Sequence, residues 1–281
     1  MRFLVLALAL SSGACVDLVG AAAGRYVERE EKRFAVTGRP ELTLSTFDGA
    51  IEVRPWDRTD VEVVVEKRAS SKESVAAITV DTKQTGTHID VDVRAPRMSG
   101  FTFHAGRSAK LIVSVPSGTN VAAKSGDGAI DIEGITGTID LHSGDGGIRA
   151  RGLSGDVRAT TGDGTVRLSG AFHSLKVHTG DGSVTVTATG AGRTAEDWDI
   201  STGDGAVTLE LPKAFGAELD AHTGDGRIHL EDVTVSNVSG AIGRSTLQGR
   251  LGDGGAALRI RTGDGSITLR SVPSSGTGDS R

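Results

Sequence analysis

Residues 125–142 read SGDGAIDIEGITGTIDLH, and this stretch decides the fold. Its first four residues belong to a Ser/Thr/Leu-Gly-Asp-Gly motif that occurs eight times, with the first four copies spaced by 18 residues each. The copies begin at Ser125, Ser143, Thr161, Thr179, Thr202, Thr223, Leu251 and Thr262. A fixed short period is typical of a solenoid, because a unit this small cannot close a core alone and has to stack on copies of itself.

Each 18-residue unit divides into two halves, and each half is a turn followed by a strand. Glycine opens almost every turn, where we expect the chain to need a positive φ. Behind the turns, apolar residues alternate with polar ones, which is the period-2 pattern of a strand with one buried face. One predicted inward ladder comprises Ile130, Ile132, Ile148, Ala150, Val166, Leu168, Val184, Val186, Val207, Leu209, Ile228 and Leu230. The facing ladder comprises Ile139, Leu141, Val157, Ala159, Leu175, Val177, Trp198, Ile200, Leu219, Ala221, Leu258 and Ile260.

These ladders predict an all-β fold, a right-handed parallel β-helix or β-solenoid with about 18 residues per coil and neighbouring strands ~4.8 Å apart. The outward residues support the same register, because opposite charges then lie side by side on neighbouring coils. The predicted pairs are Asp131 with Arg149, Glu133 with Arg151, and Asp140 with Arg158. Exposed cross-strand pairs of this kind contribute roughly 0.2–1 kcal/mol each, so they select the register more than they hold the fold.

The chain divides into segments around this repeat. Residues 121–270 are the predicted solenoid, and residues 34–120 keep the strand pattern without the strict period, which indicates an irregular β part that caps one end. Within that part, Thr46 to Gly49 is a decayed copy of the motif, and Ser70 to Ala76 is a candidate helical turn. Residues 189–197 are predicted to be an inserted loop, and residues 233–251 either a decayed coil or a larger excursion.

The N-terminus indicates export. Residues 1–14 have a basic start, an apolar run and small residues, as in a signal peptide, and the apolar run is too short to span a bilayer. The only cysteine, Cys15, follows at the place where a bacterial lipoprotein is acylated, although Ser12 stands where leucine is usual. Ordinary cleavage near Ala21 to Ala23 and an inert thiol are the alternatives. We interpret residues 15–33 as a tether and the Ser/Gly-rich residues 271–281 as a disordered tail.

Composition narrows the class of protein. The chain has 281 residues with 40 glycines and one cysteine, so a disulfide-stapled scaffold is excluded. A net charge of −5 gives no support to general nucleic-acid binding. No further segment is long and apolar enough to be a predicted transmembrane helix.

The ordered set of strands and turns resembles a known family. LTLSTFDGAIEVRPW at residues 42–56, the following VEVVVEKR, IDVDVRAP and LIVSVPSG segments, and the SGDG/TGDG coils are similar to the bacterial putative-adhesin domain family, a family of unknown function. The resemblance covers roughly residues 34–270. It implies an envelope-associated β-solenoid, and it brings no catalytic residues and no cofactor to carry over.

Three kinds of side chain are candidates for binding. A basic strip comprises Arg149, Arg151 and Arg167 on one outward face and Arg158 and Lys176 on the other, and it suits anionic envelope polymers. The motif carboxylates of Asp127, Asp145, Asp163 and Asp181 form a column that is a calcium candidate, which we disfavour because Ca²⁺ needs six to eight oxygens at one point. His142, His178 and His222 occupy equivalent positions, but His142 and His178 lie two coils (roughly 9.6 Å) apart, too far to share Zn²⁺.

The sequence therefore predicts a lipid-anchored, exported protein of the cell envelope that acts as a binding or scaffold surface without catalysis. Its partner is an unidentified envelope polymer or protein, and it reaches the membrane through the N-terminal lipid. The alternatives are a polysaccharide-processing β-helix enzyme and a calcium-stabilised structural repeat. The enzyme is disfavoured because no paired carboxylates or Ser-His-Asp set follows from the spacing.

Overall fold

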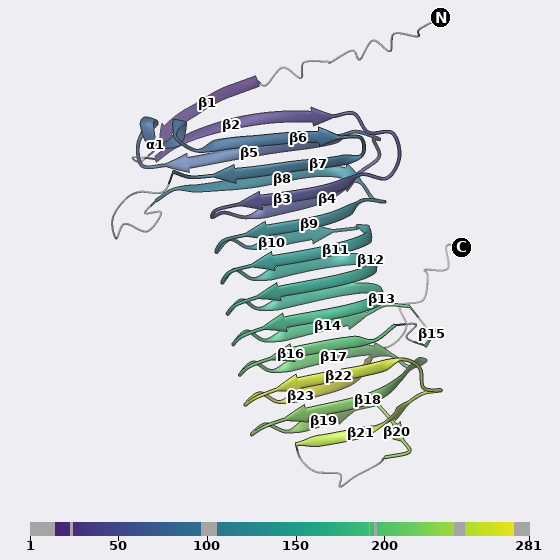
Figure 1. The fold of residues 1–281 in the computed structure, drawn as a ribbon. Coiled ribbons are helices and arrows are strands. Elements are labelled where there is room, and N and C mark those ends of the chain that lie inside the picture. Colours follow the sequence, from purple (N-terminus) through teal and green to yellow (C-terminus); the bar gives the residue numbers. More distant parts are fainter. Residues whose placement is uncertain are drawn as a thin grey trace, which may run out of the picture.

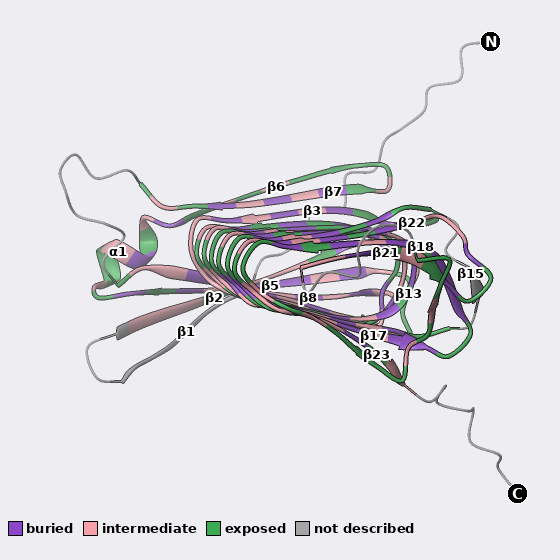
Figure 2. Cartoon of the chain, turned by 90° about the horizontal axis from the view of Figure 1, so that it is seen from below, coloured by how far each residue is buried: buried purple, intermediate pink, exposed green. Residues whose placement is uncertain are grey.

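The computed structural model describes residues 15–22, 25–96, 106–190, 192–193, 196–238 and 245–272, and of residues 15–22, 25 and 192–193 the backbone alone. Strands dominate, and one short helix, α1 (Lys72–Ala76), begins at the N-cap Ser71, so the all-β prediction and the predicted helical turn are confirmed. The strands stack into a tall column with a broader N-terminal end (Figure 1). Seen along its axis, the column is a flattened tube with buried residues inside (Figure 2).

Two faces make up the column. Face A holds the strands that enter the Ser/Thr-Gly-Asp-Gly turns or occupy equivalent places: β7 (His88–Arg94), β3 (Glu41–Thr46), β9 (Asn120–Ser125), β11 (Thr136–Ser143), the second halves of β12 (Ile148–Thr161) and β13 (Val166–Thr179), β16 (Trp198–Thr202), β22 (Ala257–Thr262) and β18 (Phe215–Thr223).

Face B holds the strands that leave those turns: β8 (Ser108–Pro116), β4 (Ile51–Trp56), β10 (Ile130–Glu133), the first halves of β12 and β13, β14 (Val184–Ala188), β17 (Val207–Pro212), β23 (Ile267–Val272) and β19 (Ile228–Glu231). We call one face A strand with the face B strand that follows it a rung. Neighbouring rungs pair in parallel, and the register joins residues 18 apart in the regular part, such as Ile130 with Ile148.

The predicted charge register is confirmed. Asp131 pairs with Arg149 and Glu133 with Arg151 between β10 and β12. Asp140 pairs with Arg158 between β11 and β12. The apolar residues that alternate with these charged residues are buried, so a register slip by one position would expose a whole apolar ladder to solvent.

The motif turns owe their glycines to close stacking of backbones. A Cβ on Gly146 would lie 2.3 Å from the carbonyl oxygen of Gly128 in the previous rung, and a Cβ on Gly164 2.2 Å from that of Gly146. The expectation of positive φ is wrong for these two glycines. It holds at the opposite turns, where Gly134 and Gly152 have φ of 64° and 62°, and in the Leu251 copy of the motif, where Gly252 and Gly254 have φ of 51° and 77°. Positions 146 and 164 need glycine because successive motif turns lie closer together than any side chain allows.

In every motif that opens with serine or threonine, the hydroxyl is buried and donates to the neighbouring turn, and in most of them it also accepts from its own turn. Ser143 Oγ donates to the carbonyl of Gly128 in the previous rung at 2.9 Å and accepts from the amide of Gly146 in its own turn at 3.1 Å. The motif hydroxyls buried in this way are Ser125, Ser143, Thr161, Thr179, Thr202, Thr223 and Thr262. This ladder satisfies turn backbone groups that the core would otherwise leave without partners.

Both ends of the column contain a rung that is out of chain order. Near the C-terminus, β22 pairs with both β16 and β18, and β23 with both β17 and β19, so the last rung of the chain lies between two earlier ones (Figure 1). Near the N-terminus, β3 lies between β7 and β9, and β4 between β8 and β10. Neither insertion follows from the period, because every motif rung presents the same apolar pattern to its neighbours.

The C-terminal end explains one wrong prediction. Ile228 is only half-buried and Leu230 is 41% exposed, although both were assigned to the inward ladder. Their strand, β19, pairs with β23 on one side, and no strand among the described residues covers its other side. The excursion proposed for residues 233–251 is confirmed: β20 (Val235–Ser236) and β21 (Thr246–Leu251) form an antiparallel pair, and β21 pairs antiparallel with β18.

The N-terminal end corrects the predicted tether. Residues 25–33 belong to β2 (Arg25–Phe34), which pairs antiparallel with β5 (Val61–Ala69), and β1 (Cys15–Ala22) pairs with β2. The inward positions of β2 include Glu28 and Glu30, and both form ion pairs with Lys67 of β5, which is 4% exposed. Because polar residues occupy inward positions, this segment lacks the alternation of apolar and polar residues that would have predicted a strand. The antiparallel pair of β6 (Thr79–Thr85) with β7 completes this end.

The remaining boundary predictions fall partly outside the described residues. The signal peptide (1–14) and residues 273–281 of the predicted tail lie there, as does the side chain of Cys15. Ser271 and Val272, which were assigned to the tail, are the last residues of β23. The predicted loop at 189–197 includes the two-residue strand β15 (Gly192–Arg193).

Candidate functional site

The five predicted basic residues gather on two neighbouring strands. Arg149, Arg151 and Arg158 belong to β12, and Arg167 and Lys176 belong to β13. We call this set the cationic belt, because it has members on both faces at one level of the column. All five side chains are exposed.

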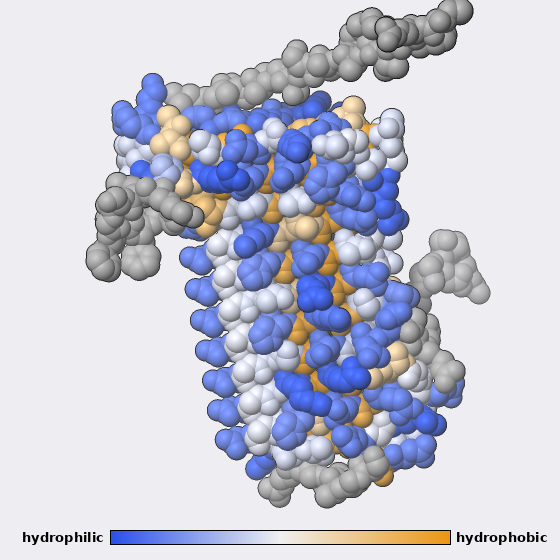
Figure 3. Space-filling model, in the orientation of Figure 1, coloured by the Kyte–Doolittle hydropathy of each residue, from blue (hydrophilic) through white to orange (hydrophobic). Residues whose placement is uncertain are grey.

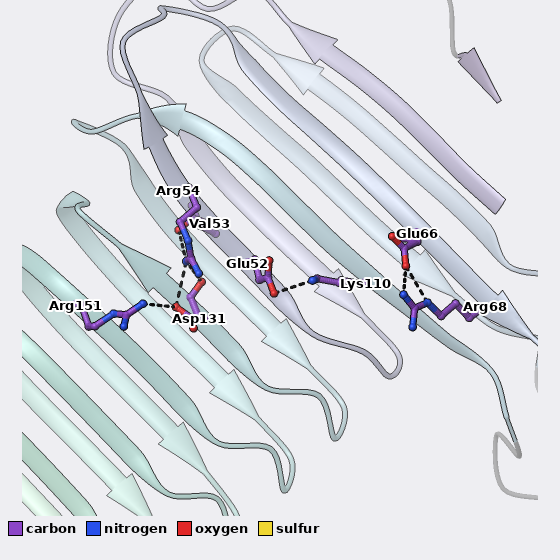
Figure 4. A network of polar contacts seen from close by, with 8 residues as sticks. All are labelled: Glu52, Val53, Arg54, Glu66, Arg68, Lys110, Asp131 and Arg151. Atoms are coloured by element: carbon purple, nitrogen blue, oxygen red, sulfur yellow. Dashed lines mark hydrogen bonds and ion pairs between the residues drawn. The ribbon is translucent and has the colours of Figure 1, made fainter. Parts of the chain in front are cut away.

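One member of the belt is neutralised by carboxylates. Arg151 lies 3.9 Å from Asp131 and 3.6 Å from Glu133, and Arg54 of β4 binds the same two carboxylates from the other side at 3.1 and 3.6 Å. Figure 4 shows the contacts of Asp131 with Arg54 and Arg151, and the neighbouring Glu52–Lys110 ion pair, which has a distance of 2.7 Å. Arg151 is therefore a structural ion-pair partner rather than a free binding group.

Two further members lie side by side on face B. Arg149 and Arg167 pair in register, and among the described residues neither has an ion-pair partner within 4.0 Å. Like charges directly opposite each other between strands are destabilising. Both side chains are exposed, and neither lines the face A groove described next.

The last two members line a groove on face A. Arg158 and Lys176 pair in register between β12 and β13. With Asp199 and Ser201 of β16 they line a hollow of about 190 Å³, which we call the face A groove. The other residues that line it are Thr160, Val177 and His178. In Figure 3, hydrophilic side chains lie along the column on both sides of an apolar stripe.

Hydrogen bonds order one wall of the groove. His178 Nδ1 lies 3.0 Å from Ser201 Oγ, and the same hydroxyl is 3.5 Å from the carbonyl oxygen of Val177. These contacts hold His178 and Ser201 to each other rather than to the cations. The ammonium of Lys176 and the guanidinium of Arg158 keep their donors free for a ligand, because neither forms an ion pair or side-chain hydrogen bond among the described residues.

Asp140 and Asp199 flank the two cations in register, and two other carboxylates further along the column form ion pairs with arginines. The face A sequence of outward residues runs Asp140, Arg158, Lys176, Asp199, Arg259 and Asp220 through the paired strands. Arg259 binds Asp197 at 2.9 Å and holds the pKa of that carboxyl below its usual value. Arg261 binds Asp220 and lowers its pKa in the same way. Arg158 and Lys176 are thus neighbouring cations of face A that form no ion pair within 4.0 Å among the described residues.

The calcium candidates form a line rather than a cluster. Asp127, Asp145, Asp163 and Asp181 are exposed, one per rung, along the edge of motif turns that appears hydrophilic in Figure 3. Each carboxylate lies beside the next turn: Asp127 Oδ1 is 2.9 Å from where a Cβ of Gly144 would be. Among the residues that the structure describes, no three His, Cys, Asp or Glu side chains are grouped so as to hold a metal ion.

The three histidines keep the separation that the sequence predicts. His142 and His178 are joined through Thr160 of the rung between them. His222 lies on β18, and its Nδ1 is 2.9 Å from Thr246 Oγ1. They are therefore separate side chains of an outward polar ladder, and only His178 belongs to the face A groove.

Sequence reasoning missed part of the groove. Thr160 and His178 follow Arg158 and Lys176 by two residues, so their shared face could have been predicted from the strand alternation. Asp199 and Ser201 could not be placed by the 18-residue period, because Lys176 pairs with a residue 23 positions later. The prediction that Trp198 points inward is confirmed: it is 2% exposed, and its ring packs against Phe172 and Phe215 with centroid distances of 5.8 and 5.2 Å.

A family model matches residues 40–195 and 137–270, which together span most of the described column. The chain belongs to the Toastrack DUF4097 family. This confirms the resemblance to a domain family of unknown function that the strand and turn motifs indicated. Curated proteins include no match to the sequence.

Several solved structures align with the fold at low identity. A putative cell adhesion protein from Clostridium sporogenes has 13% identity and a TM-score of 0.41 over 87% of this chain and 100% of that one. A putative adhesin from Bacteroides fragilis has 12% identity and a TM-score of 0.37 over 87% and 97%. A putative lipid binding protein from Parabacteroides distasonis has 13% identity and a TM-score of 0.34 over 86% and 96%.

The helices give no sign of a membrane span. Among the described residues, none is long and apolar enough to cross a bilayer.

Proposed function

We propose that the protein is an exported component of the cell envelope that binds an anionic polymer through the face A groove and does not catalyse a reaction. The observation that carries this proposal is the register pairing of Arg158 with Lys176 in a groove where neither cation has an ion-pair partner among the described residues. Two like charges at this spacing cost stability, and a ligand that neutralises both removes that cost.

The chemistry of the two cations suits phosphate or carboxylate groups. A guanidinium presents a planar fork that can bind a phosphate or carboxylate with two hydrogen bonds, and an ammonium binds the next group as a compact point charge. Strands of neighbouring rungs are ~4.8 Å apart, which is close to the length of one sugar unit in an extended chain. Thr160, Ser201 and His178 add hydrogen-bonding groups for hydroxyls. A phosphorylated or uronic glycan combines these features.

The finer architecture and the anchoring belong to the same proposal. The parallel pairing of residues 18 apart supports a parallel β-solenoid with about 18 residues per coil, and we propose that it is right-handed. The small residues before Cys15 and the apolar run of residues 3–10 support acylation of Cys15 after export. The lipid would then hold the column at a membrane surface by its N-terminal end.

A binding screen with product analysis tests the proposal. Polyphosphate, polygalacturonate and neutral dextran are titrated into the purified protein at low salt, once with Ca²⁺ and once with EDTA, and the polymers are checked by mass spectrometry. We expect saturable binding of the two anionic polymers, no binding of dextran, no change with EDTA and no shortened product. Shortened polymer would show an enzyme, and binding that requires Ca²⁺ would show a calcium-dependent repeat.

A further inference from the structure

A second hollow lies at the C-terminal end of the column, away from the cationic belt. It has a volume of about 280 Å³ and is bounded by the ends of β17 and β23, the start of β18 and the turn after β21. Its walls include the buried side chains of Leu211, Phe215 and Leu251. We call it the end cavity.

The out-of-order rung explains why a cavity forms there. Because β22 and β23 lie between β16/β17 and β18/β19, the connection from β17 to β18 passes over one rung. On this side of the column, the last residue of β23, Val272, pairs with Pro212, the last residue of β17. The turn from β17 to β18, the end of β23 and the segment after β19 therefore meet around the end cavity.

The cavity contains a buried hydroxyl without a partner. Ser271 pairs with Leu211 and occupies an inward position, where β17 has leucine. Its Oγ is buried and has no hydrogen-bond partner among the described residues. A buried polar atom without a hydrogen bond lowers the stability of the fold by about 1–3 kcal/mol. An apolar side chain would avoid this cost, so the hydroxyl at this position needs an explanation.

Two opposite charges lie at the rim. Lys213 and Asp232 are exposed, both line the cavity, and among the described residues neither forms an ion pair. Asp232 has φ of 54°, a left-handed conformation that costs energy for a side chain other than glycine. An ammonium and a carboxylate at the rim, with a buried hydroxyl and apolar walls inside, match a ligand that carries both charges and an apolar group.

We infer that the end cavity binds a small zwitterion with an apolar side chain, of the class of free aliphatic or aromatic amino acids. In this arrangement Lys213 and Ser271 bind the carboxylate, Asp232 binds the ammonium, and the side chain packs against Leu211, Phe215 and Leu251. The size is appropriate, because small-molecule sites are mostly apolar hollows of about 300 Å³ or more with a few polar groups. The site is independent of the face A groove, and it stands if no polymer binds there.

Calorimetric titration of the purified full-length chain with four probes tests the inference. L-leucine and L-phenylalanine carry both charges, hexanoate carries only the anion and hexylamine only the cation. We expect at least one of the two amino acids to bind more tightly than either single-charge probe. Equal or tighter binding of hexanoate would overturn the role of Asp232, and no binding of any probe would overturn the site.

Variants locate the binding. Ser271→Ala, Lys213→Gln and Asp232→Asn should each weaken amino-acid binding by about tenfold or more, as expected for loss of a hydrogen bond to a charged group. Lys83→Gln, an exposed lysine of β6 at the other end of the column, is the matched control and should leave the affinity unchanged. If Lys83→Gln and Lys213→Gln weaken binding equally, the ligand is held by general charge and not by the end cavity.

Discussion

Thr179 Oγ1 donates a hydrogen bond of 3.0 Å to the carbonyl of Gly164, one rung earlier, and the threonine is completely buried. The same relationship joins each motif hydroxyl to the turn before it, for example Thr161 to Gly146 at 2.8 Å. The motif therefore joins neighbouring turns through a side chain where the backbones themselves lie too close for a Cβ.

Replacing that hydroxyl should destabilise the column. Thr179→Val keeps the shape of the side chain but leaves a buried carbonyl without this donor, so we expect the free energy of unfolding to fall by about 1–3 kcal/mol. Urea denaturation measures it. Thr185→Val, at an outward half-buried position of β14, is the control and should change stability by less than about 0.5 kcal/mol. Equal effects of the two substitutions would contradict the role of the motif hydroxyl.

The second glycine of the motif should tolerate no side chain. A Cβ at Gly164 would lie 2.2 Å from the carbonyl oxygen of Gly146, so Gly164→Ala has to push two rungs apart and should cost on the order of 1–3 kcal/mol. Gly118→Ala is the matched control, because no atom lies within 4 Å of the corresponding Cβ. The melting temperatures of the two variants check this. A Gly164→Ala protein as stable as the control would show that the turns can separate without loss.

The ion pairs inside the N-terminal end should make stability depend on alkaline pH. Burial lowers the pKa of Lys67, but the hydrogen bonds to Glu30 and Glu28 outweigh it, and the net pKa is raised. Because the folded-state pKa lies above the unfolded value of ~10.4, this contribution is complete below that pH and is lost as the pH rises through the folded-state pKa. Lys67→Met leaves two partly buried carboxylates unpaired and should cost about 3–5 kcal/mol.

A rescue variant separates charge from packing at this place. Adding Glu28→Gln and Glu30→Gln to Lys67→Met removes the uncompensated carboxylates and should recover much of the stability in urea denaturation at pH 7. If the triple variant is no more stable than Lys67→Met, the loss comes from packing and the ion pairs are not what stabilises β2 against β5.

The contribution of Asp220 to stability should be lost at acidic pH. Its hydrogen bond with Arg261 lowers its pKa, so its contribution is present above the unfolded value of ~3.9 and is lost as the pH falls through the lower folded-state value. Arg261→Gln should bring the pKa of Asp220 back toward its usual value. The carboxyl chemical shift of Asp220, followed by NMR between pH 2 and 6, measures it.

The repeat predicted the regular part of the fold because one physical pattern recurs there. The 18-residue spacing placed Arg158 beside Lys176 and Asp131 beside Arg149 correctly, since each strand offers the same apolar positions to the next. Where a loop changes the spacing, as between Lys176 and Asp199, the sequence alone does not fix the partner. The sequence therefore predicted the two cations of the groove but not Asp199 and Ser201, which line its other side.

The ends of the column could not be predicted for a different reason. Any motif rung can stack on any other, so the insertion of β22 and β23 between earlier rungs depends on the long excursion before them, which contains no repeat. Likewise, inward Glu28 and Glu30 are stable only because Lys67 reaches them from β5. Because these residues are polar, the sequence predicted a tether where the structure has strand β2.

The central claim is that the face A groove binds an anionic polymer, and one comparison of affinities tests it most directly. The dissociation constant of the anionic polymer that binds best is measured at low salt for Arg158→Ser/Lys176→Ser and for the face B pair Arg149→Ser/Arg167→Ser. Both double variants remove two charges from the same two strands. We predict that the face A variant binds about 10–100-fold more weakly than the face B variant. Equal affinities, or a larger loss in the face B variant, would contradict the account.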